Sequence, residues 1–259
     1  MVIVMELCVQ ECIILKQWNF RDRDRMVTFL AQGRGRFTGI ARGARSLTGR
    51  GSSSFEPFTH GTIYFEVQPG RDLVKIKKCD PLPPHLFLNP SYDRYLLASY
   101  FSELLTLCPL GETEAEGFFS LLLDALKQLG QPDCPLPLLR LGFELDFMKL
   151  LGVAPRFSRC GNCGKVLFQK SSQGWDLLEA KAHQLDIHLG IRCPVCRSQG
   201  EGIMDLSPQA MAFVGHWRDP EYTGSLDTSS QVLGELERAL TRHLLYHLER
   251  TPRALALLP

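Results

Sequence analysis

The sequence has no apolar run of 18 residues, the length that a membrane-spanning helix needs. Its first residues, MVIVMELCVQECIILK, carry Glu6 and Glu11 and have no basic start, so we expect no secretory signal. Nine cysteines is an odd number, and without an export signal they fit free thiols in a reducing compartment better than a disulfide framework. We therefore expect a cytoplasmic protein that does not contact membranes.

The motifs of common catalytic sites are missing as well. The chain contains no G-x-x-x-x-G-K-[ST] phosphate loop, no G-x-S-x-G nucleophile elbow and no H-E-x-x-H metalloprotease motif. The seven histidines are scattered, and we interpret the i, i+4 pair His243 and His247 as packing or surface residues rather than a metal pair. The motifs therefore do not predict an enzyme.

The net charge of +1 conceals an uneven distribution along the chain. Residues 1–78 contain 13 Lys and Arg against 7 Asp and Glu, whereas residues 79–259 contain 16 against 21. A cationic excess in one third of a chain indicates an anionic partner for that third.

Arginine is most concentrated in GRGRFTGIARGARSLTGRG, residues 33–51, which contain no acidic residue. Guanidinium groups bind phosphates bidentately, glycines allow close backbone approach, and Phe37 and Phe55 offer rings on which unpaired bases could stack. The alternative interpretation is a solvated arginine loop. We predict that the residues that bind nucleic acid are Arg34, Arg36, Arg42, Arg45, Arg50, Lys75 and Lys77.

Residues 6–78 show the pattern of a small β-domain. Strand-length apolar runs recur every 10–15 residues and are separated by turns rich in Gly and Pro. Five strands in fewer than 80 residues match the size of an OB-type barrel, although periodicity alone does not separate it from an SH3-like barrel. The segment 44–57, rich in Gly, Ser and Arg, is predicted to be a mobile loop.

The pattern becomes helical after residue 89. Apolar residues repeat at i, i+3 and i+4, which predicts a bundle of three consecutive helices followed later by two more. Ser207 and the proline after it indicate the start of the fourth helix. The segments predicted to be helical are 92–108, 114–130, 137–152, 207–217 and 230–250.

Two C-x-x-C steps lie between the third and fourth helices, Cys160–Cys163 and Cys193–Cys196. Each step can supply two thiolates from one tight turn, and two steps supply the four ligands of a tetrahedral zinc site. We expect Gly164 to adopt a positive φ, and GWDLLEA and HQLDIHLG to form strands between the steps. Such a closed four-thiolate site is structural, because no coordination position remains for water.

Other interpretations of the cysteines remain open at this stage. His183 or His188 could replace one thiolate, and a thioredoxin-like redox pair would need a C-x-x-C step at a helix N-terminus, which neither pair provides. The other cysteines lie in apolar strand, helix or boundary contexts and are predicted to be packed thiols. They are Cys8, Cys12, Cys79, Cys108 and Cys134.

The order of these parts resembles the bacterial DNA-repair family RecO. The resemblance rests on residues 11–45, which end in ARGAR, on the following PFT strand, and on LLG-x-x-P before the first C-x-x-C; ASYFSELL, GIRCPVC and LSPQAM continue it. Family members often carry more Lys and Arg in the loop that here reads SLTGRGSSS. The similarity covers nearly the whole chain.

The resemblance implies an α+β protein: an N-terminal OB-fold barrel, then an α-helical domain with an inserted Cys₄ zinc-ribbon-like region. The corresponding domains would be 1–80, 81–156 with 205–259, and 157–204. It also implies a non-catalytic recombination mediator of the RecF pathway with one structural zinc ion. Such a mediator binds single- and double-stranded DNA, anneals complementary strands, and works with RecR to load RecA where single-strand-binding protein (SSB) coats the DNA.

Two other hypotheses come from different functional classes. A zinc-ribbon and OB adaptor would bind protein partners rather than DNA, and a thiol oxidoreductase would use the C-x-x-C cysteines chemically.

Overall fold

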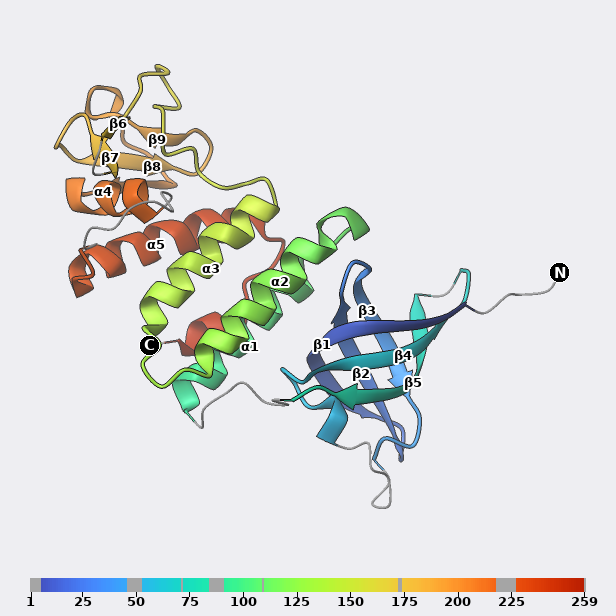
Figure 1. Ribbon diagram of the computed structural model, residues 1–259. Coiled ribbons are helices and arrows are strands. Elements are labelled where there is room, and N and C mark those ends of the chain that lie inside the picture. Colours follow the sequence, from blue (N-terminus) through green and yellow to red (C-terminus); the bar gives the residue numbers. More distant parts are fainter. Residues whose placement is uncertain are drawn as a thin grey trace. The chain divides into compact units, whose positions relative to one another are not determined.

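The computed structural model describes residues 6–45, 53–70, 72–83, 91–108, 110–171, 174–217 and 227–258. The chain divides into two compact units, one formed by residues 1–139 with 250–259 and the other by residues 140–249. Figure 1 shows the elements of both units coloured along the sequence. No helix within the described ranges is long and apolar enough to cross a membrane.

The first unit begins with a closed five-stranded barrel whose strand order is β1-β2-β3-β5-β4 (Figure 1). Strands β3 and β5 pair in parallel, and the other neighbours pair antiparallel. This is the Greek-key arrangement of an OB-fold, so the predicted barrel is confirmed. The strands are β1 (Glu6–Phe20), β2 (Asp24–Ala31), β3 (Gly35–Ala41), β4 (His60–Val67) and β5 (Leu73–Pro81).

Alternate residues of each strand fill the barrel interior. Phe29, Phe37 and Phe65 pack against one another there, with ring centroids 5.0–5.7 Å apart. The interior also contains Phe55, from the short 3₁₀ helix η1 (Ser53–Phe55), so one end of the predicted mobile loop contributes to the core. Residues 46–52 of that loop lie outside the described residues.

A β-bulge at Leu15 changes which residues of β1 face the interior. Before the bulge, Cys12 and Ile14 lie in the core; after it, the register with β2 resumes at Lys16 opposite Thr28. The extra residue reverses the alternation, so Trp18 points out of the barrel although it has the same sequence parity as Ile14.

Helices α1 (Tyr92–Leu107) and α2 (Glu112–Leu129) belong to the same unit as the barrel. An arginine caps the carboxyl end of each helix, where the last carbonyls lack intrahelical partners. Arg36 of β3 donates to two carbonyl oxygens at the end of α1, and Arg94 of α1 donates to three carbonyl oxygens at and beyond the end of α2.

The second unit holds most of helix α3 (Leu136–Leu150) and everything from there to residue 249. Two small sheets, β6-β7 and β10-β8-β9, lie between α3 and α4 in the chain. The two predicted strands between the cysteine pairs are confirmed as β7 and β8. The strands are β6 (Phe168–Ser171), β7 (Gly174–Leu177), β8 (His183–Asp186), β9 (Gly190–Arg192) and β10 (Ile203–Leu206).

The remaining helices begin where the sequence predicted. Helix α4 (Pro208–Trp217) begins after Ser207, whose hydroxyl accepts the Ala210 N–H, and α5 (Ser230–His247) begins after Ser229, which caps Val232 in the same way. A 3₁₀ helix η3 (Ala254–Leu257) follows in the first unit, where the Ala254 N–H donates to Glu103 of α1 at 2.9 Å. The proposed division into three domains stays a prediction.

Candidate metal centre and nucleic-acid interface

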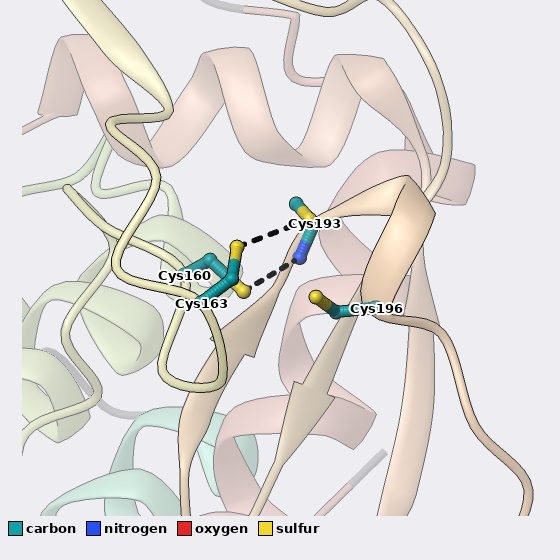
Figure 2. A group of neighbouring side chains, drawn as sticks. All are labelled: Cys160, Cys163, Cys193 and Cys196. Carbon is teal, nitrogen blue, oxygen red and sulfur yellow. Dashed lines mark hydrogen bonds between the residues drawn. The ribbon is translucent and has the colours of Figure 1, made fainter.

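Four cysteine side chains meet in the second unit, all from the two predicted C-x-x-C steps (Figure 2). Cys160 and Cys163 lie in a turn before β6, Cys193 directly follows β9, and Cys196 ends the 3₁₀ helix η2 (Pro194–Cys196). The four sulfur atoms all lie within 4.8 Å of one another. Residues 30 positions apart in the chain are thus brought into one cluster.

Close backbone contacts hold the two cysteine turns together. The Gly161 N–H donates to the Ile191 carbonyl at 2.7 Å, so the first turn is tied to β9. A Cβ atom at Gly161 would lie 1.8 Å from the Leu189 carbonyl oxygen, and only glycine allows this approach. Gly164 has a φ of +74°, as predicted, and its N–H donates to the Cys160 carbonyl at 2.9 Å.

The geometry fits a tetrahedral ion held by four thiolates. With Zn–S bonds of about 2.3 Å, the sulfurs of such a site stand about 3.8 Å apart. The Cys163 and Cys193 sulfurs are 3.9 Å apart. Four soft thiolates favour zinc over magnesium or calcium. When bound, the ion would cross-link the two turns, and the four protein ligands would leave no position for a reacting water.

Hydrogen bonds favour the thiolate form of Cys160. Burial opposes ionisation of Cys160, but N–H groups of Cys163, Cys193 and Asn162 outweigh it and lower the pKa of Cys160 to about 6. The Asn162 side-chain amide also donates to the Cys196 sulfur at 3.3 Å. Thiolate ligands must be deprotonated to bind metal, so these donors favour the metal-binding form.

The alternative ligands do not join the cluster. His183 is fully buried in β8, its Nδ1 lies 2.8 Å from the Lys181 carbonyl, and His188 stacks edge-on against Tyr246. Among the described residues, the four cysteines form the one group of three or more metal-ligating side chains.

The five other cysteines are free thiols, four buried and Cys134 partly exposed, which confirms that they are packed.

Five of the seven predicted DNA-binding residues make bonds within the barrel unit, and three of these are arginines. Arg36 donates through Nη1 to the Leu105 carbonyl at 2.6 Å and to the Cys108 carbonyl at 2.9 Å. Arg34 forms a 3.2 Å ion pair with Glu6. Arg45 donates to the carbonyls of Arg21 and Asp22, so it supports the β1–β2 turn.

Three other predicted residues lie together on β5 and at the end of β3. Arg42 and Lys75 line a surface hollow of about 520 Å³, and Lys75 and Lys77 both approach Glu66, at 3.6 and 2.7 Å. Arg42 is exposed and forms no hydrogen bond or ion pair with any residue in the described part of the chain. Arg50 lies outside the described residues. The structure therefore brings Arg42, Lys75 and Lys77 together, and DNA contact by any of the seven stays a prediction.

Family models match both parts of the chain. The model described as "Recombination protein O N terminal" matches residues 5–85, and the one described as "Recombination protein O C terminal" matches residues 89–256. The chain belongs to the recombination protein O (RecO) family. The boundary between the two models falls between the barrel and helix α1.

Curated relatives from several bacteria agree with this membership. A protein named "DNA repair protein RecO" from Roseiflexus sp. is 30% identical over 96% of this chain and 83% of its own length. Proteins of the same name from Symbiobacterium thermophilum and Pelotomaculum thermopropionicum are each 28% identical, over 92% and 98% of this chain and over 91% and 94% of their own lengths. Family membership implies a role in DNA repair and recombination.

The two rings predicted to stack on bases both pack into or against the barrel core. Phe55 is buried in the barrel core, and Phe37 packs from inside against Phe29 and Phe65. This prediction was wrong because Phe37 follows Arg36 on the same strand, and neighbouring residues of a strand point to opposite faces. Among the described barrel residues, the large exposed aromatic side chain is Trp18 on β1, which the prediction missed because it lies outside the arginine-rich segment.

Proposed function

We propose that this RecO chain is a non-catalytic recombination mediator of the RecF pathway. It binds single- and double-stranded DNA, anneals complementary strands and, with RecR, helps to load RecA on single-stranded DNA coated by SSB. It acts in the bacterial cytoplasm and joins the nucleoid during repair. One structural zinc ion is bound by Cys160, Cys163, Cys193 and Cys196.

The observation that carries the proposal is the combination of an OB-type barrel with a surface hollow lined by two cations, Arg42 and Lys75, and one acid, Asp72. OB-folds bind oligonucleotides on the outer face around strands 2 and 3. Here a hollow of about 520 Å³ lies at the end of β3 and the start of β5, and Arg42 and Lys75 line it. Phosphate binding by such cations releases counterions, so DNA affinity should fall steeply with salt.

The chemistry of the metal centre supports a non-catalytic role. Four thiolates fill a tetrahedral shell and leave no site where a substrate or water could bind the metal. The same shell argues against the thiol oxidoreductase, because thiolates bound to a structural ion are not available for disulfide exchange. RecR, RecA and SSB enter the proposal through the family resemblance alone.

Salt-dependent DNA binding by an Arg42→Ala/Lys75→Ala variant tests the proposal. Fluorescence anisotropy with a labelled oligo(dT) should show weaker binding and a flatter plot of log affinity against log salt. Removing one cation from a phosphate should lower the slope by about 0.7. The matched control is Lys127→Ala, which removes an exposed cation from helix α2 in the same unit. An unchanged slope in the double variant would place the DNA surface elsewhere.

The adaptor hypothesis makes a different prediction. An adaptor would capture RecR or SSB and leave both single-stranded and duplex DNA unbound at physiological salt. A mediator should instead accelerate annealing of complementary oligonucleotides without nucleotide hydrolysis. Zinc analysis of the same sample should find one zinc ion per chain.

A further inference from the structure

One row of side chains crosses four strands on the outside of the barrel. Trp18 of β1 is paired with Met26 of β2, Met26 with Ile40 of β3, and Ile40 with Lys75 of β5. Paired residues of neighbouring strands point to the same side of a sheet. The row faces outward because the residues beside it in sequence, such as Val27, lie in the barrel core.

A second row runs beside the first one. Lys16 is paired with Thr28, Thr28 with Thr38, and Thr38 with Leu73. The Thr28 and Thr38 hydroxyls are 3.0 Å apart, and Leu73 is 42% exposed. Together the two rows form a surface with Met26, Ile40 and the two threonines in its middle, of which Thr28 is buried, and with a lysine at each end. We call these eight residues the outer platform.

At the other end of these strands, the outward-facing residues are covered by packing within the same unit. Ile13 and Leu30 are paired on the same outer side, yet both are completely buried. Arg36, the partner of Leu30 on β3, extends to the end of helix α1. Packing within the barrel unit thus covers that end, whereas Lys16, Trp18, Leu73 and Lys75 of the platform are exposed.

The Trp18 ring is exposed on the outside of the barrel, where it is available to contact a ligand. Trp18 is 41% exposed and lies beyond Ile13, the last described residue of β1 that pairs with β4. The Lys16 ammonium lies 5.4 Å from the Trp18 ring centroid, and the Arg21 guanidinium lies 5.1 Å from the centroid of Phe20, two residues further along β1. Each outward ring of β1 therefore has a cation beside it.

The platform leads directly into the hollow lined by Arg42 and Lys75. Ile40 belongs to the first row and also lines the hollow, together with Leu73 and the acidic Asp72. Strands lie about 4.8 Å apart, so the row from Trp18 to Lys75 spans about 14 Å. An aromatic surface next to a cationic groove is the combination with which proteins bind single strands, since bases stack on the rings and phosphates follow the cations.

We propose that Trp18 is a stacking site for an unpaired nucleobase, with Lys16, Arg42 and Lys75 placed for the flanking phosphates. This inference rests on the proposed DNA-binding function and adds a preference for single strands. In a duplex the base faces are already stacked on one another and cannot cover the indole. Phosphate contacts are available from both forms of DNA, so Trp18 is the residue that distinguishes them.

The test compares Trp18→Ala and Trp18→Phe on a labelled oligo(dT) and on a duplex of equal length. Loss of one base–aromatic stack should weaken binding to the single strand about 5- to 150-fold. Duplex affinity should change less than twofold, and Trp18→Phe should retain most of the single-strand affinity. The slope against salt should stay the same, because every cation that meets a phosphate is still present. Tyr92→Ala, which removes a 69% exposed ring from α1, is the matched control.

A second readout reports on the ring itself. The chain has three tryptophans, so Trp175→Phe/Trp217→Phe leaves Trp18 as the single tryptophan, whose fluorescence is excited separately from that of the tyrosines. Stacking should quench its fluorescence on addition of oligo(dT) and leave it unchanged on addition of duplex.

Several results would overturn the inference. Unchanged single-strand affinity in Trp18→Ala would do so, and so would an equal loss for single strand and duplex, since that would indicate a general effect on the fold. Loss of RecR binding with normal DNA binding would assign the ring to a protein partner. If the wild-type chain bound neither form of DNA, the proposed function itself would fail, which is a distinct outcome.

Discussion

Arg36 of β3 closes the carboxyl end of helix α1 by donating from Nη1 to the Leu105 carbonyl oxygen at 2.6 Å. The same nitrogen donates to the Cys108 carbonyl at 2.9 Å. These carbonyls have no further helical N–H to accept from, and a cation at a helix C-terminus also interacts favourably with the helix dipole. Arg36 lies in an arginine-rich segment of the sequence, but its guanidinium is used to join the barrel to the helix.

Replacing Arg36 should therefore affect stability more than DNA binding. Arg36→Ala removes a charged donor from two carbonyl groups, and we expect a loss of about 1.5–3 kcal/mol in the free energy of unfolding. Urea denaturation followed by circular dichroism measures this loss. Arg42→Ala is the matched control, because Arg42 is exposed and forms no bond within the described residues, and its stability should change by less than about 0.5 kcal/mol.

In DNA binding, replacing Arg42 should have the larger effect and replacing Arg36 the smaller one. Arg42→Ala should flatten the dependence of affinity on salt, whereas folded Arg36→Ala should keep the wild-type slope. If Arg36→Ala kept full stability and lost salt dependence, Arg36 would be a phosphate contact, and the capping role would be secondary.

The metal centre predicts that one cysteine substitution removes the ion. Cys193→Ser replaces a thiolate that lies 3.9 Å from the Cys163 sulfur and whose own N–H donates to the Cys160 sulfur at 3.3 Å. Zinc content measured by inductively coupled plasma mass spectrometry should fall from one per chain to near zero. Zinc binding contributes roughly 10–16 kcal/mol in small zinc modules, so hydrogen exchange in residues 157–204 should accelerate.

Cys134→Ser provides the control for this substitution. Cys134 lies between α2 and α3 and is not part of the cluster, so this variant should keep its zinc and its exchange protection. Retention of one zinc per chain in Cys193→Ser would contradict the four-cysteine assignment.

Glycine substitutions should have opposite effects in different parts of the second unit. In Gly161→Ala the new methyl group would lie 1.8 Å from the Leu189 carbonyl oxygen, so the first cysteine turn must move away from β9. We expect partial zinc loss and lower thermal stability. In Gly234→Ala, inside helix α5, the nearest atom would be 3.4 Å away on the flexible Arg238 side chain, so stability should rise by about 0.5–1 kcal/mol.

Scanning calorimetry and zinc analysis on the same samples separate the two effects. Equal stability of Gly161→Ala and wild type would show that the turn has room to relax, and the close contact would then not be a constraint.

The cysteine cluster was predictable because its information is local. Each C-x-x-C step determines its own turn, and the requirement for four ligands then brings the two steps together whatever lies between them. The closed barrel was predictable for a similar reason, since short apolar runs and turns set the number of strands. Only the choice of OB-fold over another small barrel needed the family resemblance.

The binding face was harder to predict, because it depends on a bulge. A strict alternation from Ile14 would place Trp18 inside the barrel, and the extra residue at Leu15 turns it outward. Apolar runs such as CIILK do not show where such a bulge falls. Likewise, the sequence does not reveal that Arg36 meets the carbonyls of a helix some 70 residues later. Both features depend on pairing between distant segments.

The stability of the second unit should decrease with acidification through His243 of α5. This side chain is 4% exposed, and its Nε2 lies 2.8 Å from the Val153 carbonyl, to which the neutral ring donates. Its Nδ1 is buried without a hydrogen-bond partner among the described residues. Burial is the main cause that lowers the pKa of His243 below its usual value, and the neighbouring His247 adds to it, while the Val153 carbonyl opposes it.

The direction of the pH effect follows from proton uptake. In the unfolded chain a histidine has a pKa of about 6.5, so between this value and the lower folded pKa the unfolded state binds more protons. Stability is therefore complete above pH 6.5 and is lost as the pH falls toward the folded pKa, by at most about 1.4 kcal/mol per pH unit for this proton. Burial likewise lowers the pKa of His183, which adds to the same trend.

Comparing His243→Gln with the wild type at pH 7.5, 6.5 and 5.5 isolates this contribution. The glutamine amide can still donate to the Val153 carbonyl but does not titrate in this range. Zinc release at low pH affects both proteins equally, so it cancels in the difference, and metal content measured at each pH verifies this. Urea unfolding should show a smaller loss of stability between pH 7.5 and 5.5 in the variant. Identical losses in the two proteins would mean that His243 is protonated as readily in the folded chain as in the unfolded one.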